Sequence, residues 1–243
     1  MKIKVKGRTV DFFEHDVSTK NKIAVSTSSG TDSTLVLYLT ALCLPDKKII
    51  PYHLEESQYP GQKPNLLKII DYLNSILPTK NITQPITNYC DYSTKGSKWK
   101  LQAIENPGEL PKKPDGNTGQ AKILASRYYE DREWKKGTID YLVLGSTSNP
   151  PIEALKNLTE PYEERRNTNN RPEPLVGDSH YLPFFHLDKS YIAEMWKKYI
   201  LMEAFPLTIS CIEYSPNIIK PCKKCYWCYE KFWAFGMYDG GIK

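Results

Sequence analysis

The chain has 243 residues, of which 40% are hydrophobic and 25% are charged, and its formal net charge at pH 7 is +5. These values are typical of one soluble globular domain of α/β size, with room for a small appendage. No apolar run approaches the roughly 20 residues of a membrane span, and residues 1–6 lack the apolar stretch of a signal peptide. We therefore expect a cytoplasmic protein with no membrane partner. Its basic residues form scattered pairs, so the charge does not require a nucleic-acid partner.

Alternating patterns along the chain predict a parallel sheet. Residues 2–13 alternate apolar and polar side chains around Lys6-Gly7, which predicts a short N-terminal hairpin. Strand-like runs then begin at Ile23 and cover residues 48–54, 82–86 and 140–147, and helical spacing follows Thr34 and covers residues 64–77, 121–134 and 191–201. Strands that alternate with helices build βαβ units, so we expect a doubly wound, Rossmann-like α/β fold.

A loop of small polar residues joins the first strand of this sheet to the helix after it. The candidate phosphate-binding residues in this loop are Ser26, Thr27, Ser28, Ser29, Gly30, Thr31, Asp32, Ser33 and Thr34. The unpaired amides and the positive dipole end of a helix favour a phosphate at such a place. No Gly-Lys-Ser/Thr and no G-x-G-x-x-G spacing follows, which excludes a Walker-type loop and removes the main argument for a dinucleotide. The alternative is that these residues only cap the helix.

Residues 28–34, Ser-Ser-Gly-Thr-Asp-Ser-Thr, resemble the S-G-G-x-D-S-[ST] loop of the PP-loop ATP pyrophosphatase superfamily. The resemblance implies an adenine nucleotide alpha hydrolase-like fold that binds ATP on a parallel sheet and often adenylates a carboxylate or carbonyl. Ser29 stands where the superfamily usually has its first glycine, so a positive φ at this position would be strained.

Two further groups are expected at the carboxyl edge of the sheet, where open parallel sheets bind ligands. His53 follows the second predicted strand and either contacts the adenine or ribose or packs a loop as a partly buried histidine. Gly145, Ser146 and Thr147 end a later strand and would lie beside the phosphate loop if the two strands are neighbours.

Four cysteines near the C-terminus have the spacing of a metal site. Cys211, Cys222, Cys225 and Cys228 form C-x10-C-x2-C-x2-C, and four thiolates satisfy a tetrahedral Zn²⁺ in a closed structural site. An iron–sulfur cluster also accepts four thiolates, so the spacing leaves the metal open. A cluster of this density predicts a metal rather than disulfides in a chain without an export signal.

Several motifs, which together span nearly the whole chain from Ile23 onward, resemble those of the 7-cyano-7-deazaguanine synthases, which are PP-loop enzymes. The resemblance is carried by the phosphate loop, the Gly-Ser-Thr strand end, the Leu187-Asp188-Lys189 step before a helix and the cysteine-rich C-terminal segment. It implies that Ser28, Gly30, Asp32, Ser33 and Thr34 hold the ATP phosphates and Mg²⁺. It also implies that Gly145 lines the substrate pocket and that Lys189 faces the nucleotide or the substrate.

In that family ATP activates the carboxylate of 7-carboxy-7-deazaguanine, ammonia gives an amide, and a second activation dehydrates the amide to the nitrile. The chemistry requires neutralisation of the charge on the leaving phosphate and an acceptor held in line. The catalytic residues that the resemblance predicts are Asp32, Ser33 and Lys189, the cofactors are ATP, Mg²⁺ and Zn²⁺, and the substrates are a 7-deazaguanine-like carboxylate and ammonia.

The resemblance does not extend to every family motif. Gly119-Gln120-Ala121 stands where the family has Gly-Arg-Asn, and Ser148-Asn149-Pro150-Pro151 replaces its acidic and aromatic substrate segment. Two other classes therefore stay open. A PP-loop sulfurtransferase or sulfonucleotide reductase would use the same loop with Cys90 or the four cysteines as its thiol or cluster ligands. A nucleic-acid-binding zinc protein would instead show salt-sensitive duplex binding without ATP turnover.

We expect three parts: an N-terminal hairpin extension over residues 1–19, a PP-loop ATP-binding domain over residues 20–205 and a zinc-binding module over residues 206–243. A homodimer is left open.

Overall fold

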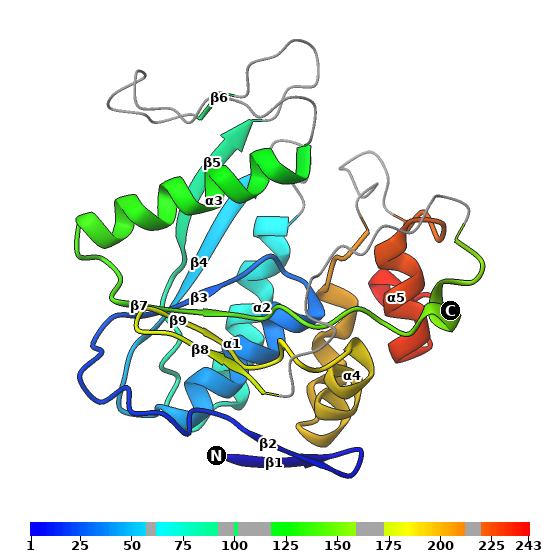
Figure 1. Cartoon of the computed structure of the whole chain (residues 1–243), viewed down its shortest axis with the longest axis horizontal. Coiled ribbons are helices and arrows are strands. Elements are labelled where there is room, and N and C mark those ends of the chain that lie inside the picture. The colour runs from blue at the N-terminus through cyan, green and yellow to red at the C-terminus, as the bar shows by residue number, and fades with distance from the viewer. Residues whose placement is uncertain (57–61, 92–99, 102–117, 159–172, 212–219) are drawn as a thin grey trace.

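The computed structural model describes residues 1–56, 62–91, 100–101, 118–158, 173–211 and 220–243. Within these residues, a seven-stranded sheet has the strand order β6-β5-β4-β3-β7-β9-β8 (Figure 1). The strands are β3 (Ile23–Ser26), β4 (Ile49–Glu56), β5 (Ile86–Asp91), β6 (Lys100–Leu101), β7 (Tyr141–Leu144), β8 (Leu175–Val176) and β9 (His180–Leu182). The five inner strands pair in parallel, and β6 and β8 are antiparallel edges.

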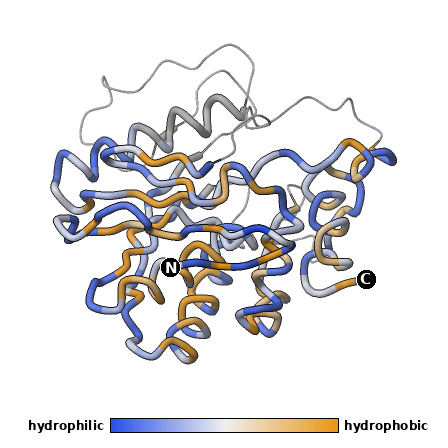
Figure 2. Tube along the Cα trace, turned by 60° about the horizontal axis from the view of Figure 1, so that its bottom comes forward, coloured by the Kyte–Doolittle hydropathy of each residue, from blue (hydrophilic) through white to orange (hydrophobic). Residues whose placement is uncertain are grey.

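Helices cover both faces of this sheet, as the alternating pattern predicts. α1 (Thr31–Cys43) and α2 (Gln62–Ile76) lie on one face and α3 (Thr118–Lys135) on the other (Figure 1). Ile23 and Val25 of β3 join the core on the α1 face, whereas Ala24 between them joins Tyr129 of α3. Side chains of a strand point alternately to opposite faces, so one apolar strand supplies both cores. Figure 2 shows hydrophobic stretches in orange both in the strands and in the helices packed against them.

The connections reverse direction at the centre of the sheet. From β3 the chain adds β4 and then β5 on one side, and it later returns to add β7 on the other side of β3. The carboxyl ends of β3 and β7 therefore flank a topological switch point, where doubly wound folds bind their ligands. Both predicted polar strand ends, residues 26–34 and 145–147, meet there.

Shorter elements surround the sheet. Strands β1 (Lys2–Val5) and β2 (Arg8–Asp11) form the predicted antiparallel hairpin, whose turn residues Lys6 and Gly7 both have positive φ. The C-terminal part contains α4 (Lys189–Lys198) and α5 (Tyr226–Phe235), which pack against each other, and the short helices η2 (Ile152–Leu155), η3 (Leu201–Leu207) and η4 (Asp239–Gly241).

Two sequence predictions are wrong in detail. The third strand does not cover residues 82–86: only Ile82 makes an isolated bridge, and β5 begins at Ile86. Pro85 has no N–H to donate to a ladder, so the strand begins after it. The strand also continues beyond its predicted end at residue 86: β5 extends to Asp91, and Cys90 within it pairs with β4 and β6.

The division into three domains stays a prediction. Most of the Lys-, Gly- and Pro-rich stretch 91–119 and the mixed-charge stretch 160–171 lie outside the described residues. No helix among the described residues is both long and apolar enough to cross a bilayer.

Candidate nucleotide site and four-cysteine centre

The candidate phosphate loop, residues 26–34, turns sharply between β3 and α1. Ser29 has a left-handed backbone with φ of 55°, and it occupies the position where the resemblance to the PP-loop motif implies glycine. The strain anticipated from a serine at this position is therefore present. The loop is held from both sides: Thr27 N–H donates to the Tyr52 carbonyl of β4 at 2.8 Å, and Ile209 N–H donates to the Ser29 carbonyl at 3.0 Å.

Hydroxyl groups of α1 fold back onto the loop. Ser33 Oγ lies 3.2 Å from Ser28 N, from which it accepts a hydrogen bond, and it donates to the Gly30 carbonyl at 3.1 Å. Thr34 Oγ1 donates to the same carbonyl at 2.8 Å. Gly30 is the N-cap of α1, and no side-chain hydrogen bond is formed at the cap. The hydroxyls thus shape the loop, and helix capping alone does not account for them.

The end of β7 lies directly against this helix start. β3 and β7 are parallel neighbours, which confirms the arrangement expected for Gly145. A Cβ on Gly145 would come within 2.8 Å of the Asp32 carbonyl carbon and oxygen and 3.0 Å of Ser33 N. Only glycine permits this approach of two backbones. Next to Gly145, Ser146 is exposed and Thr147 is buried.

Lys189 reaches the phosphate loop from α4. Its Nζ lies 3.1 Å from Asp32 Oδ2 and 3.2 Å from Glu230 Oε2 of α5. Lys189 is 3% exposed, whereas 20% of the Asp32 side chain is exposed. Asp188 caps α4 by accepting a hydrogen bond from Ser190 N at 2.9 Å. The structure therefore brings together Asp32, Ser33 and Lys189, the three residues predicted to be catalytic.

His53 lies elsewhere than expected. It is fully buried inside β4, which continues to Glu56, and its Nδ1 lies 2.8 Å from the Thr27 carbonyl. This position matches the packing interpretation, in which the imidazole supports the loop backbone. Contact of His53 with the nucleotide stays a prediction.

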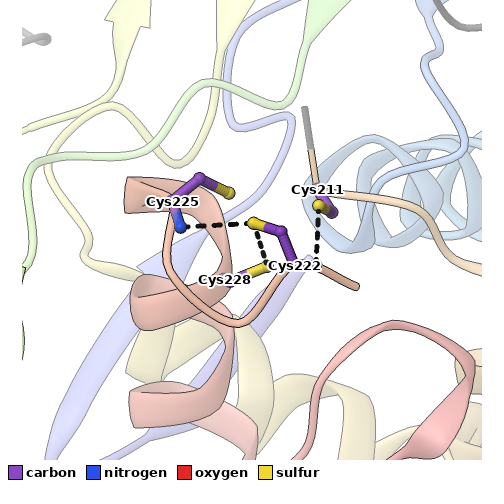
Figure 3. A group of neighbouring side chains, drawn as sticks. All are labelled: Cys211, Cys222, Cys225 and Cys228. Atoms are coloured by element: carbon purple, nitrogen blue, oxygen red, sulfur yellow. Dashed lines mark hydrogen bonds between the residues drawn. The ribbon is translucent and has the colours of Figure 1, made fainter. Parts of the chain in front are cut away.

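The four cysteines converge as their spacing predicts. Their sulfur atoms all lie within 4.8 Å of one another, and three of the four residues are buried (Figure 3). Cys222 N–H donates to Cys211 Sγ, and Cys225 N–H donates to Cys222 Sγ, both at 3.3 Å. Cys225 is the N-cap of α5, so two ligands come from the start of this helix. Cys43 is not part of the group.

The donor set fits a tetrahedral metal. Zn–S bonds of about 2.3 Å separate tetrahedral sulfurs by about 3.8 Å, and Cys222 Sγ and Cys228 Sγ are 3.9 Å apart. Hydrogen bonds with the neighbouring thiols of Cys211 and Cys225 raise the pKa of Cys228, which keeps its thiol protonated. A bound cation would be required to hold all four groups as thiolates. Backbone N–H donors to sulfur are the outer-shell contacts expected around thiolate ligands. Four thiolates are the donor set of structural zinc and also of iron–sulfur clusters, so the ligand types do not distinguish the two.

A buried charge network lies beneath both sites, and the sequence analysis did not identify it. Lys231 Nζ donates to Asp239 Oδ1 at 2.5 Å and to Thr208 Oγ1 at 2.7 Å, and its side chain is fully buried. Asp239 Oδ2 accepts from the backbone N–H groups of Ser210 and Cys211. The one available signal was the charged pair Glu230-Lys231 inside the otherwise aromatic helix 226–235, because a charge in an apolar helix requires a partner.

Comparisons with known proteins add one structural likeness. No family model matches the chain, and no curated protein matches it. The chain is similar to the structure of the U34-tRNA thiolase NcsA from Methanococcus maripaludis with its [4Fe-4S] cluster, with 12% sequence identity and a TM-score of 0.40. The match covers 87% of this chain and spans 62% of that one. Neither the fold nor the function of this chain is inferred from this likeness.

Proposed function

We propose that this protein is an ATP-dependent enzyme of the PP-loop type that transfers an adenylyl group to its substrate and releases pyrophosphate. The observation that carries the proposal is the Asp32–Lys189 pair at the start of α1, at the switch point of a doubly wound parallel sheet. Backbone amides of a helix start and the ammonium group of Lys189 converge there. Such donors stabilise the negative charge that develops on a leaving phosphate.

The acceptor that we propose is a carboxylate resembling 7-carboxy-7-deazaguanine. The carboxylate oxygen attacks the α-phosphorus of ATP and pyrophosphate leaves. Ammonia then attacks the acyl carbon, giving an amide and AMP, and a second ATP activates the amide oxygen before loss of AMP yields the nitrile. Gly145, Ser146 and Thr147 are the residues proposed to face this substrate, because they end the strand beside the phosphate loop.

Mg²⁺ and a resident metal complete the proposal. Asp32 is the partly exposed carboxylate of the loop and is the residue that would hold Mg²⁺ with the phosphates, where the ion supplies charge neutralisation. Four cysteines leave no open coordination position on Zn²⁺, so the metal that they hold would be structural. We place the protein in the cytoplasm.

A second candidate is a PP-loop sulfurtransferase. The observation that favours it is the link between the two sites: Ile209, which donates to the Ser29 carbonyl of the phosphate loop, is two residues from Cys211. The thiolate cluster is therefore tied to the loop that would bind ATP. An iron–sulfur cluster in this position would supply sulfur chemistry next to an adenylated substrate.

One incubation tests both candidates. Purified protein is mixed with ATP, Mg²⁺, ammonia and 7-carboxy-7-deazaguanine, and all products are identified by mass spectrometry. We expect AMP, pyrophosphate and the amide or nitrile, about one zinc per chain and a colourless protein. Brown protein with iron and sulfide, and no product with ammonia, would favour the sulfurtransferase.

Asp32→Ala is the variant that tests the site itself. It should abolish ATP turnover, because Asp32 would hold the Mg²⁺ that neutralises charge on the phosphates. Metal content and melting temperature should change little, because Gly30 and not Asp32 is the N-cap of α1. Asp46→Ala, which removes an exposed carboxylate after the other end of α1, is the matched control and should keep full turnover. Normal ATP consumption by Asp32→Ala would remove the main support for an enzyme of this type. Salt-sensitive duplex binding without ATP turnover would favour the nucleic-acid-binding zinc protein instead.

A further inference from the structure

The Lys189 ammonium group is shared between two carboxylates from different parts of the chain. Asp32 of α1 lies 3.1 Å from Nζ on one side, and Glu230 of α5 lies 3.2 Å from it on the other. The two carboxylates differ in exposure, since the Asp32 side chain is 20% exposed and that of Glu230 is 0% exposed. Asp32 thus faces the open side of the site, and Glu230 supports the lysine from inside the protein.

Glu230 lies on the helix whose first turn carries two of the four cysteines. It lies in α5 two residues after Cys228, and Cys225 is the N-cap of the same helix. The helix is also held at its next residue, because Lys231 is bonded to Thr208 and Asp239. A metal bound by the four cysteines would set the position of the first turn of α5, and through it the position of the Glu230 carboxylate.

A lysine side chain has four flexible methylene groups and needs a partner to hold one geometry. If Asp32 were its only partner, the ammonium group would be held by the carboxylate that the proposed reaction needs for Mg²⁺ and phosphate. Glu230 provides a second, buried anchor that keeps Nζ beside the loop when Asp32 is engaged. Removing the Glu230 charge would take away this buried anchor, so that Lys189 would compete more strongly with Mg²⁺ for Asp32.

We propose that Glu230 is a positioning residue for Lys189, so that α5 and its cysteines form part of the nucleotide site. This inference rests on the proposed function, since it assigns Lys189 to nucleotide phosphate. Glu230 itself does not touch the nucleotide. It acts only through Lys189, and this property can be measured.

The experiment is a double-mutant cycle on the metal-loaded protein. Binding of an ATP analogue with a methylene group between its α- and β-phosphates is measured by calorimetry in the presence of Mg²⁺. The variants are Glu230→Gln, Lys189→Met and the double variant. Glu194→Gln is the control, because Glu194 is an exposed carboxylate on α4 that pairs with Lys197 at 2.8 Å and lies away from the loop. Metal content and melting temperature are recorded for each.

We expect Glu230→Gln to weaken binding about tenfold or more, the loss typical of one charge-assisted hydrogen bond, and Glu194→Gln to leave it unchanged. Because Glu230 acts through Lys189, the double variant should bind as weakly as Lys189→Met and no more weakly. A purely structural Glu230 would instead lower the melting temperature or the metal content without this non-additivity.

Other outcomes overturn the inference. Binding by folded Glu230→Gln within twofold of the parent would show that Lys189 needs no second anchor, while the proposed function would stand. Weaker binding by the double variant than by Lys189→Met would show that Glu230 acts independently. If Glu230→Gln fails to fold, the double variant, which removes the buried Glu230 charge together with the ammonium group that it pairs with, supplies the comparison with Lys189→Met. A parent protein that binds no nucleotide would overturn the proposed function and this inference together.

Discussion

Replacing Ser29 with glycine should stabilise the protein. Ser29 has a φ of 55°, in the left-handed region that costs an L-residue about 1–2 kcal/mol, whereas glycine adopts it freely. Glycine also gives the unfolded chain more conformational freedom, which offsets about 0.5–1 kcal/mol of the gain. The buried Ser29 Oγ has no hydrogen-bond partner among the described residues, so its removal loses no bond that the structure shows. The net expectation is about 1 kcal/mol of added stability.

The measurement is urea unfolding of Ser29→Gly and of the parent, with thermal unfolding as a second probe. For a chain of this size 1 kcal/mol corresponds to a rise of about 2–4 °C in melting temperature. Ser29→Ala is the matched control, since it removes the hydroxyl and keeps the strained backbone. We expect Ser29→Gly to be more stable than Ser29→Ala by about 1 kcal/mol. Equal stability of the two variants would refute the argument from backbone strain.

Three further expectations concern stability and the site. Asp239→Ala should cost about 3–5 kcal/mol in urea unfolding and lower the metal content, because it leaves the ammonium group of Lys231 buried without its counter-charge. Gly145→Ala should cost about 1–3 kcal/mol and weaken nucleotide binding, since its Cβ would clash with backbone, whereas Gly177→Ala, which has ordinary contacts, tests for a general glycine effect. Burial lowers the pKa of His15 in the folded protein, so the free energy of unfolding should fall as the pH drops through about 6.5, and His15→Gln should reduce this slope.

The fold was largely predictable because its signals are local. Short apolar strands that alternate with helical spacing specify a parallel sheet, and the residues that end β3 and β7 mark its ligand edge. The same local reasoning failed at the third strand, where a proline among apolar residues delays the start of β5 to Ile86. It also placed His53 at the end of a strand that continues to Glu56.

The sequence predicts the cysteines and the loop residues of the two candidate sites, but it does not predict the charged residues that connect them. Spacing accounts for three of the four cysteines, because Cys222, Cys225 and Cys228 follow one another at intervals of three residues into the start of α5. Cys211 joins them from a separate segment, where its N–H is held by Asp239. The loop residues likewise follow from one strand-to-helix junction. No sequence spacing identifies the partners of Glu230 and Asp239. The charged pair in α5 indicates that partners exist, but only the packing of α4, α5 and η4 shows which residues they are.

Energetics indicate that these buried charges do more than stabilise the fold. Desolvation of a buried ion pair consumes most of its Coulombic gain, and apolar replacements of similar volume are often as stable or more stable. Hydrophobic side chains in α5 would thus serve stability as well as Glu230 and Lys231 do. What apolar groups cannot do is fix an ammonium group beside the phosphate loop and a carboxylate beneath Cys211, as these residues do. The same residues therefore connect the cysteine cluster to the loop, and loss of metal from the parent protein should weaken nucleotide binding even where the sheet stays folded.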